Sequence, residues 1–200
     1  YLPPILATFL EARPGITVEF CNGVIDSLLP KLNDGSLDLI FTTLDFPNSS
    51  EIVKEPLVFV EQGLFARADH PILLNVHLSA EDLQSWSWVT LKGDYVGHNR
   101  LGAFFAAHRL APPTVRMEMA PDLSIISMVG QSDLLCCLPL KMEQLAIASG
   151  LQRLPLDAVE LWRSKAGVAY RNTDRLPPAS GALLAIIREH FGASLPIDGS

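Results

Sequence analysis

The amino-acid sequence predicts an α/β protein made of two lobes, and three observations lead to this class. Helix-period and strand-like segments alternate along the chain, an order that favours parallel strands joined by helices. Two such groups, at 16–42 and 88–138, are separated by longer strand-like stretches at 57–66 and 161–170. The composition supplies a core, because 48% of the 200 residues are hydrophobic and the mean hydropathy is +0.26. We therefore expect about seven strands, with the two longer stretches crossing between the lobes.

The first group begins with a helix and ends with a buried strand. Apolar residues over 2–9 repeat with the period of one helical face, and an Arg-Pro-Gly sequence then stops the helix. Alternation of apolar and polar residues predicts a strand at 16–21. A second helical stripe covers 25–32 and ends at Gly35, where a left-handed backbone suits glycine. The mostly apolar run at 37–42 is typical of a strand buried on both faces.

The remaining elements follow from the same two periods. Strands are expected at 57–66, 86–91, 114–119, 134–138, 151–156 and 161–170. Helices are expected at 99–109, 122–129, 142–148 and 182–191. Asp122 is the predicted N-cap of its helix, and Gly150 follows the end of the next one.

The charge of the chain narrows the choice of partners. Fifteen Lys and Arg residues against 22 Asp and Glu residues give a net charge of −7. This balance argues against direct binding of nucleic acid or anionic membranes, because phosphate groups require a basic patch. No run approaches the roughly 20 apolar residues that cross a bilayer, and residues 1–4 lack a signal-peptide pattern. We expect a cytoplasmic protein without a membrane partner.

The three cysteines, Cys21, Cys136 and Cys137, form a poor disulfide framework, because their number is odd and two are adjacent. Neighbouring strand residues point to opposite faces, so Cys136 and Cys137 are expected to be buried as small apolar side chains. A redox-sensing role is the alternative. The cysteines and histidines have no metal-ligand spacing, so neither a metal nor another cofactor is expected.

Signatures of catalysis are weak. Residues 130–134, Gly-Gln-Ser-Asp-Leu, begin like a nucleophile elbow but lack its last glycine, and they follow a helix and precede a strand. The chain has no P-loop and no dinucleotide-binding fingerprint. The sequence therefore favours a binding protein over an enzyme.

Short phrases spread over nearly the whole chain carry a resemblance to a known family. In chain order they are Leu2-Pro3-Pro4-Ile5-Leu6-Ala7-Thr8-Phe9, Arg13-Pro14-Gly15-Ile16, Leu32-Asn33-Asp34-Gly35-Ser36-Leu37-Asp38-Leu39, Glu55-Pro56-Leu57, Ala68-Asp69-His70-Pro71, Met128-Val129-Gly130 and Leu138-Pro139. Together they resemble the regulatory domain of LysR-type transcriptional regulators, which has the fold of type 2 periplasmic binding proteins. Two residues of these phrases also have structural interpretations, since Asp38 can cap local backbone and His70, which precedes a proline, suits a turn.

The resemblance implies two Rossmann-like lobes joined by two crossing strands, with a ligand cleft between them. Residues 1–60 and 165–200 would form lobe I and residues 61–164 lobe II. Family members have an opening strand before the Leu-Pro-Pro segment and an N-terminal winged helix-turn-helix, and neither is expected within this chain. Because the opening strand is central in the family sheet, 16–21 and 37–42 are expected not to pair directly. Residues 131–133, Gln-Ser-Asp, also depart from a frequent Gly-Leu-Gly.

The resemblance also implies four places of effector contact: the turn after 16–21, the strand end near 42, the segment 90–98 and the helix start at 121–124. The ligand-binding residues carried over are Ile25, Thr42, Thr43, Thr90, Leu91, Tyr95, His98, Asp122, Leu123 and Ser124. Helix N-termini favour negative charge, so a small anion or an aromatic acid is the expected ligand. Asp122 opposes an anion unless its carboxylate caps its own helix, and a neutral or cationic effector is the alternative.

The sequence thus predicts the effector-sensing domain of a bacterial transcriptional regulator. It would act as a homodimer, or as a tetramer in the full-length protein, through helices 24–33 and 123–131, and reach DNA only through the N-terminal domain. A transporter's solute-binding protein is the first alternative, and an enzyme on the same scaffold is the second.

Overall fold

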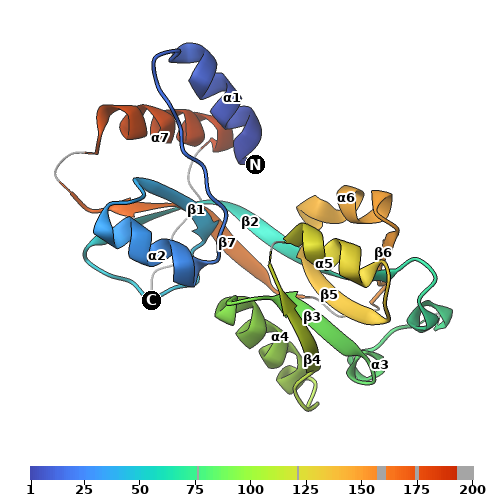
Figure 1. The fold of residues 1–200 in the computed structure, drawn as a ribbon. Helices are drawn as coiled ribbons and strands as arrows, with labels where there is room; N and C mark the ends of the chain where they lie inside the picture. Colours follow the sequence, from blue (N-terminus) through green and yellow to red (C-terminus); the bar gives the residue numbers. More distant parts are fainter. Residues whose placement is uncertain (76, 121, 157–160, 174–175, 193–200) are drawn as a thin grey trace. The chain divides into compact units, whose positions relative to one another are not determined.

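The protein, seen here in a computed structural model, divides into two compact units. The structure describes residues 1–75, 77–120, 122–156, 161–173 and 176–192 (Figure 1). The first unit is Tyr1–Phe59 with Ser164–Ser200, and the second is Val60–Arg163. These boundaries fall one residue away from the predicted lobe boundaries. The chain passes from one unit to the other within β2 (Ile52–Arg67) and at the start of β7 (Arg163–Arg171).

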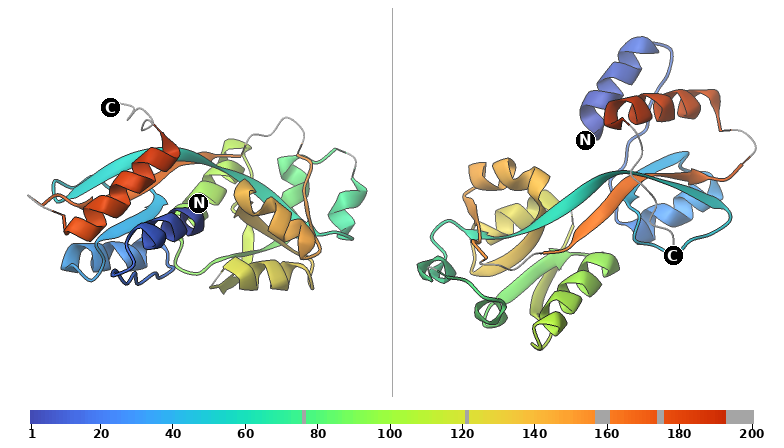
Figure 2. Two further views of the ribbon diagram at one scale, coloured as in Figure 1. Left: turned by 90° about the horizontal axis from the view of Figure 1, so that it is seen from above. Right: turned by 180° about the vertical axis from the view of Figure 1, so that it is seen from behind.

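Helices α1 (Leu2–Ala12) and α7 (Pro178–Phe191) pack side by side in the first unit, as both views of Figure 2 show. Helix α2 (Ile25–Asp34) packs against β1 (Leu39–Thr43). Residues from α1, β2, β7 and α7 form the buried core of this unit: Ile5, Leu57, Val168, Leu184 and Ile187. The helical stripes expected over 2–9 and 25–32 are confirmed.

Strand β7 lies between β1 and β2 in the sheet. Strands β1 and β7 are antiparallel, with Ile40 opposite Ala169. A Cβ atom on Gly167 would lie 1.9 Å from the Glu55 carbonyl oxygen. Glycine is therefore the residue that lets β2 and β7 approach so closely.

The strand expected at 16–21 does not form. Residues 16–24 have no regular secondary structure and no ladder joins them to β1, so the absence of direct pairing with 37–42 is confirmed. A strand needs a hydrogen-bonded neighbour, and alternation of side chains alone does not provide one. A cavity of about 160 Å³ instead lies between the two segments, with Val18, Phe20 and Cys21 on one side and Leu39, Ile40 and Phe41 on the other.

The second unit contains a mixed sheet in which β3 (Ser87–Leu91) lies between two parallel neighbours. Strand β3 runs parallel to β4 (Thr114–Met119) and to β5 (Leu134–Pro139). Strand β5 and the short β6 (Leu151–Arg153) are antiparallel to β2.

Helices cover both faces of this sheet, and each face has its own buried cluster. On one face Leu64, Trp88 and Leu135 join residues of α3 (Ala80–Gln84) and α4 (Tyr95–Ala107). On the other face their strand neighbours, including Cys136, pack against α5 (Asp122–Val129) and α6 (Glu143–Ala148). Strand β5 is therefore covered on both faces, whereas in β1, which was predicted to be buried on both faces, only Ile40 is buried.

Cys136 is fully buried in the second of these clusters, while Cys137 packs against the first, as their alternation predicted. All three cysteines are free thiols. Burial raises the pKa of both adjacent thiols, which disfavours the reactive thiolate form.

Several element boundaries differ from prediction, and caps explain two of them. Helix α4 begins at Tyr95 rather than at 99, because the Asp94 side chain accepts a hydrogen bond from the Gly97 N–H at 2.9 Å. Helix α3 was not predicted, although Ser79 and Asp82 form a reciprocal capping box around its first turn.

Other boundaries moved by a few residues. Strand β2 begins at Ile52, five residues before the predicted start. Strand β6 ends at Arg153 instead of 156, and β7 begins at Arg163 instead of 161. Asp122, the predicted N-cap, is instead the first residue of α5.

Three residues from the family-like phrases have structural roles or local contacts: Gly35, His70 and Asp38. Gly35 ends α2 with φ of 87°, as expected. His70 begins the 3-10 turn η1 (Pro71–Leu74), and its Nδ1 accepts a hydrogen bond from the Ile72 N–H at 3.0 Å, which confirms its turn role. Asp38 lies 3.8 Å from the Arg171 guanidinium rather than capping a neighbouring N–H.

Candidate functional site

The best-defined polar site lies at the carboxyl ends of β3 and β4 in the second unit. The two strands are parallel and place Thr90 directly opposite Glu118. The chain leaves β3 through Lys92, whose N–H donates to the Met119 carbonyl at 2.8 Å, and turns at Gly93 with φ of 76°. Helix α4 starts immediately afterwards, so strand ends and a helix start converge here, an arrangement typical of ligand sites in α/β folds.

His98 brings the strand end and the helix together. Its Nε2 lies within hydrogen-bond distance of the Thr90 hydroxyl and 3.7 Å from the Glu118 carboxylate. Its side chain is 26% exposed, so a ligand can reach it from one side. The imidazole, the hydroxyl and the carboxylate together can donate and accept hydrogen bonds to a polar ligand.

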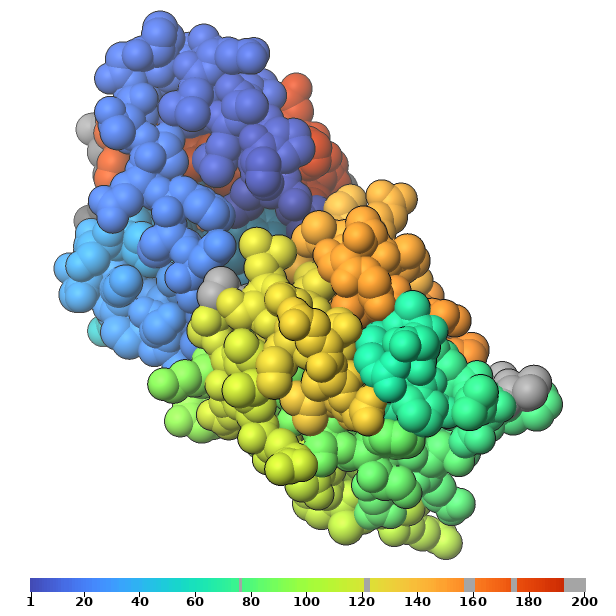
Figure 3. All heavy atoms as spheres, turned by 45° about the vertical axis from the view of Figure 1, so that its right-hand side comes forward, coloured from blue at the N-terminus to red at the C-terminus, as the bar shows by residue number. Residues whose placement is uncertain are grey.

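Large apolar groups flank this polar cluster along the chain. Tyr95, in the first turn of α4, is 65% exposed, and Leu91 at the end of β3 is half-buried. In α5, which packs against β3 and β4, Leu123 is 60% exposed and Ser124 is half-buried. The α5 segment, in yellow, lies on the face of the molecule shown in Figure 3. The side chain of Asp122 lies outside the described residues.

The first unit holds the other predicted ligand-binding residues. Thr42 and Thr43 close β1, where they pair with Gly167 and Ala166 and are half-buried. Ile25 is the first residue of α2 and is buried, so only its backbone could meet a ligand. Helix α2 has no side-chain cap, which leaves its first N–H groups to other acceptors.

The sequence did not single out Glu118 as a site residue. The strand that carries it was predicted, but its place beside Thr90 depends on the pairing of β3 with β4. Of the predicted residues, Thr90 and His98 are in direct contact. Tyr95, Leu91, Leu123 and Ser124 lie on the elements that flank this contact.

The elbow-like sequence at 130–134 has a structural role. The Ser132 hydroxyl donates to the Met128 carbonyl at 2.8 Å, and Asp133 binds the Arg67 guanidinium. These bonds close the end of α5 and hold the start of β5. Within the described part of the chain, no group of three or more His, Cys, Asp or Glu side chains could hold a metal ion.

Nearly the whole chain is similar to known proteins. A family model described as the LysR substrate binding domain matches residues 1–192. The chain belongs to this family. The LysR domain is 32% identical over 191 residues to the transcriptional regulator GalR of Pseudomonas putida, covering 94% of this chain and 47% of that protein. It is 28% identical to MetR of Escherichia coli, covering 98% of this chain and 61% of that regulator. The LysR domain thus spans about half to three-fifths of these relatives' length.

Solved structures of effector-binding domains share the fold. The effector binding domain of QuiR in complex with shikimate superposes with a TM-score of 0.80 at 18% identity, covering 95% of this chain and 90% of that one. The cofactor-binding domain of Cbl gives a TM-score of 0.78 at 17% identity, covering 93% and 81% of the two chains. The predicted two-lobe α/β fold and the LysR resemblance are confirmed. The relatives are named transcriptional regulators, and nothing in these comparisons favours a transporter.

In the ranges that the structure describes, every helix is too short or too polar to cross a bilayer.

Proposed function

We propose that this LysR domain senses a small organic acid at the carboxyl ends of β3 and β4 and, within a full-length cytoplasmic regulator, passes the signal to a DNA-binding domain. The observation that carries the proposal is the cluster of Thr90, His98 and Glu118 at the start of α4, the helix whose first turn holds the exposed Tyr95. Small-molecule sites combine a few converging polar groups with apolar surface, and this cluster has both. The chain's role is binding, without catalysis.

The ligand's chemistry follows from the same groups. A carboxylate or hydroxyl of the effector would bond to His98 and Thr90, while its ring or hydrocarbon part would lie against Tyr95 and Leu123. The carboxylates of Glu118 and Asp94 oppose a second negative charge and accept hydrogen bonds, so the part of the ligand that faces them should carry hydroxyl donors. Shikimate, the compound in the QuiR domain structure, is the first compound to test.

We also propose that residues of the first unit take part in effector binding. Thr42 and Thr43, together with the backbone at the start of α2, would bind the same effector. Regulation then requires only that the effector binds one conformational state of the regulator more tightly than the other.

The experiment is a thermal-shift and calorimetric screen of shikimate and related carboxylic acids, since a ligand of the folded state raises the melting temperature. Thr90→Val and His98→Gln should each weaken binding about fivefold to tenfold, the effect of one lost hydrogen bond. Thr114→Val is the matched control, because Thr114 lies at the opposite end of β4. Equal affinity in all four proteins would move the site elsewhere.

We also propose that the regulator is a homodimer, or a tetramer in full length, which assembles through 24–33 and 123–131. Light scattering of the full-length protein over a range of concentrations tests this assembly. A monomer at high concentration would contradict it.

A further inference from the structure

The dipeptide Asn22-Gly23 lies in the irregular segment that joins α1 to α2 in the first unit (Figure 1). Both residues are exposed. Of the six asparagines in the sequence, Asn22 alone is followed by glycine. Because glycine has no Cβ, the side chain of the preceding residue can approach its backbone nitrogen. An asparagine at this position can therefore react with the backbone that follows it.

No hydrogen bond in the described part of the chain holds either reacting group. The Gly23 N–H has no acceptor there, and the Asn22 side-chain amide has no partner. The hydrogen bonds of α2 begin one residue later, where the Val24 carbonyl accepts from the Ser27 N–H at 2.9 Å. The Gly23 nitrogen thus stays outside the helix and is free to react.

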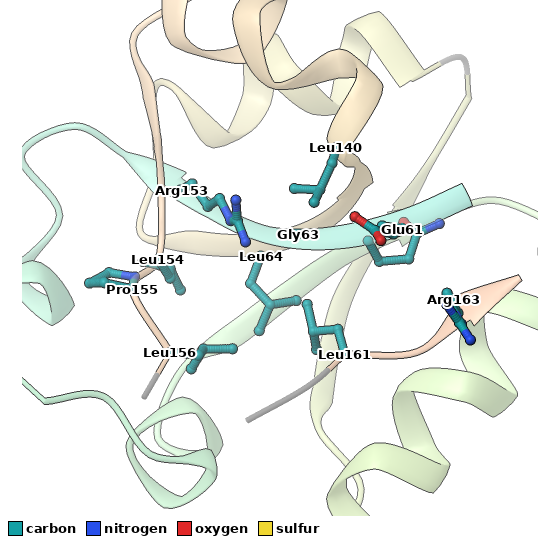
Figure 4. A pocket seen from close by; sticks show the side chains of 11 residues that line it. Glu61, Gly63, Leu64, Leu140, Arg153, Leu154, Pro155, Leu156, Leu161 and Arg163 are labelled. Carbon is teal, nitrogen blue, oxygen red and sulfur yellow. The ribbon is translucent and has the colours of Figure 1, made fainter. Parts of the chain in front are cut away.

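Gln62 and Gly63 form the corresponding glutamine–glycine pair in a protected setting. They lie within β2, in its ladder with β5. Leu140 packs beside this glycine, and an added Cβ on Gly63 would lie 2.6 Å from the Leu140 side chain (Figure 4). A paired strand holds the backbone in one extended conformation and so opposes ring closure. The fold protects this pair and leaves Asn22-Gly23 unprotected.

The reaction open to Asn22 is ring closure followed by hydrolysis. The Gly23 nitrogen forms a bond with the Asn22 Cγ atom, the Cγ–Nδ2 bond breaks, and the proton of the Gly23 N–H leaves with Nδ2 as ammonia. Water then opens the succinimide ring. Cleavage of the new bond to Cγ gives aspartate, and cleavage of the original peptide bond gives isoaspartate.

The product carboxylate would lie close to the N-terminus of α2. Val24 precedes the first helical residue, and no side chain caps the helix. A helix N-terminus stabilises negative charge, so the new carboxylate would compete there with the carboxylate of a ligand. The reaction also adds one negative charge to the chain's net charge of −7.

We propose that Asn22 is a site of spontaneous deamidation and that its product lowers the affinity of the domain for an acidic effector. The modification itself is independent of the proposed function. The loss of affinity rests on the proposed function, because it requires the effector to bind at the start of α2.

Peptide mass spectrometry of the 200-residue chain, after incubation in mildly alkaline buffer, tests the modification. We expect aspartate and isoaspartate at Asn22, at a rate that rises with pH because the attacking nitrogen must lose its proton. Asn48 is exposed in the loop after β1 but is followed by serine, so it should stay unmodified over the same time, as should Gln62. Asn22→Gln should suppress the change. An unmodified Asn22, or equal rates at Asn22 and Asn48, would overturn the proposal.

Calorimetry with shikimate tests the consequence for binding. Asn22→Asp should weaken shikimate binding about twofold to fivefold, the effect of one charge at a helix N-terminus. Asn33→Asp adds the same charge at an exposed position in the last turn of α2 and should leave the affinity unchanged. Equal affinity of the wild-type and Asn22→Asp proteins would overturn the loss of affinity. Absence of acid binding to the unmodified chain would contradict the proposed function and this loss together, whereas the mass spectra decide the modification separately.

Discussion

In each unit, effector binding is expected to depend on one hydroxyl side chain. Thr42 closes β1, and Ser124 lies in the first turn of α5. Thr42→Val and Ser124→Ala each remove one neutral hydrogen-bonding group and should cost about 1 kcal/mol of binding free energy, or about fivefold in Kd. Calorimetry with the effector found by the screen measures this change. Ser127→Ala, on an exposed position of α5, is the control, and unchanged affinity in both test variants would exclude these hydroxyls from the site.

His70 is a residue whose protonation should affect stability. It is 1% exposed, and burial holds its pKa below the usual 6.5. The unfolded chain therefore takes up a proton more readily than the folded protein, so the contribution of His70 is present above about pH 6.5 and is lost as the pH falls through its folded pKa. Protonation of Nδ1 would also break its bond from the Ile72 N–H.

The melting temperature of the wild-type protein should therefore fall more steeply in acid than that of a variant without His70. His70→Asn should lower the free energy of unfolding by about 1–2 kcal/mol at neutral pH and reduce the difference between about pH 7.5 and pH 5.5. His190→Gln, at an exposed position of α7, should leave the slope as it is. Parallel pH profiles of the wild-type and His70→Asn proteins would contradict the prediction.

At the scale of elements, the sequence predicted best the segments whose own periodicity decides their structure. Helix α1, helix α2 and strand β4 lie where the apolar repeats placed them. The segment 16–21 has an equally clear alternation but no ladder, because pairing depends on a neighbour that the local sequence cannot supply. Helix α3 was missed for the opposite reason, since its five residues carry too short a pattern and only the capping box marks it.

In the candidate site too, contacts between residues near in the sequence could be predicted, and contacts made by strand pairing could not. Thr90 and His98 follow one strand and start the next helix, so their proximity is a consequence of local β–α geometry. Glu118 is 20 residues further on and approaches His98 only because β4 pairs with β3. Side chains that meet through strand pairing are the ones that sequence reasoning did not find.

Two glycines provide a matched test of element packing. Gly167 lies where β7 meets β2, and an added Cβ would lie 1.9 Å from the Glu55 carbonyl oxygen, whereas Gly181 in α7 has open space around it. Gly167→Ala should destabilise the protein by about 3 kcal/mol, because backbone atoms must move apart. Gly181→Ala should instead be neutral or stabilising by about 0.5–1 kcal/mol, because alanine favours the helix. Chemical denaturation measures both, and a tolerated Gly167→Ala would show that β2 and β7 can separate without cost.

On the scale of the whole molecule, each unit has its own core, and the chain joins them through β2 and β7. In the first unit a cavity lies beside β1 and is bordered by 18–23. Its lining is largely apolar, and the family resemblance implies an opening strand at this point of the sheet.

Cys21 lines this cavity and reports directly on whether a strand fills it. In the 200-residue chain Cys21 is half-buried, and we expect it to react with a thiol reagent such as DTNB, while the buried Cys136 reacts only on unfolding. In a polypeptide extended at its N-terminus to include the family's opening strand, the Cys21 rate should fall by about tenfold or more, because a paired strand excludes the reagent. Cys21→Ser identifies which thiol gives the fast phase in both proteins. The extended protein should also melt at a higher temperature, since the strand adds ladder hydrogen bonds and apolar contacts to β1. Equal labelling rates in the two proteins would mean that the cavity beside β1 belongs to the folded domain and is not the place of a strand.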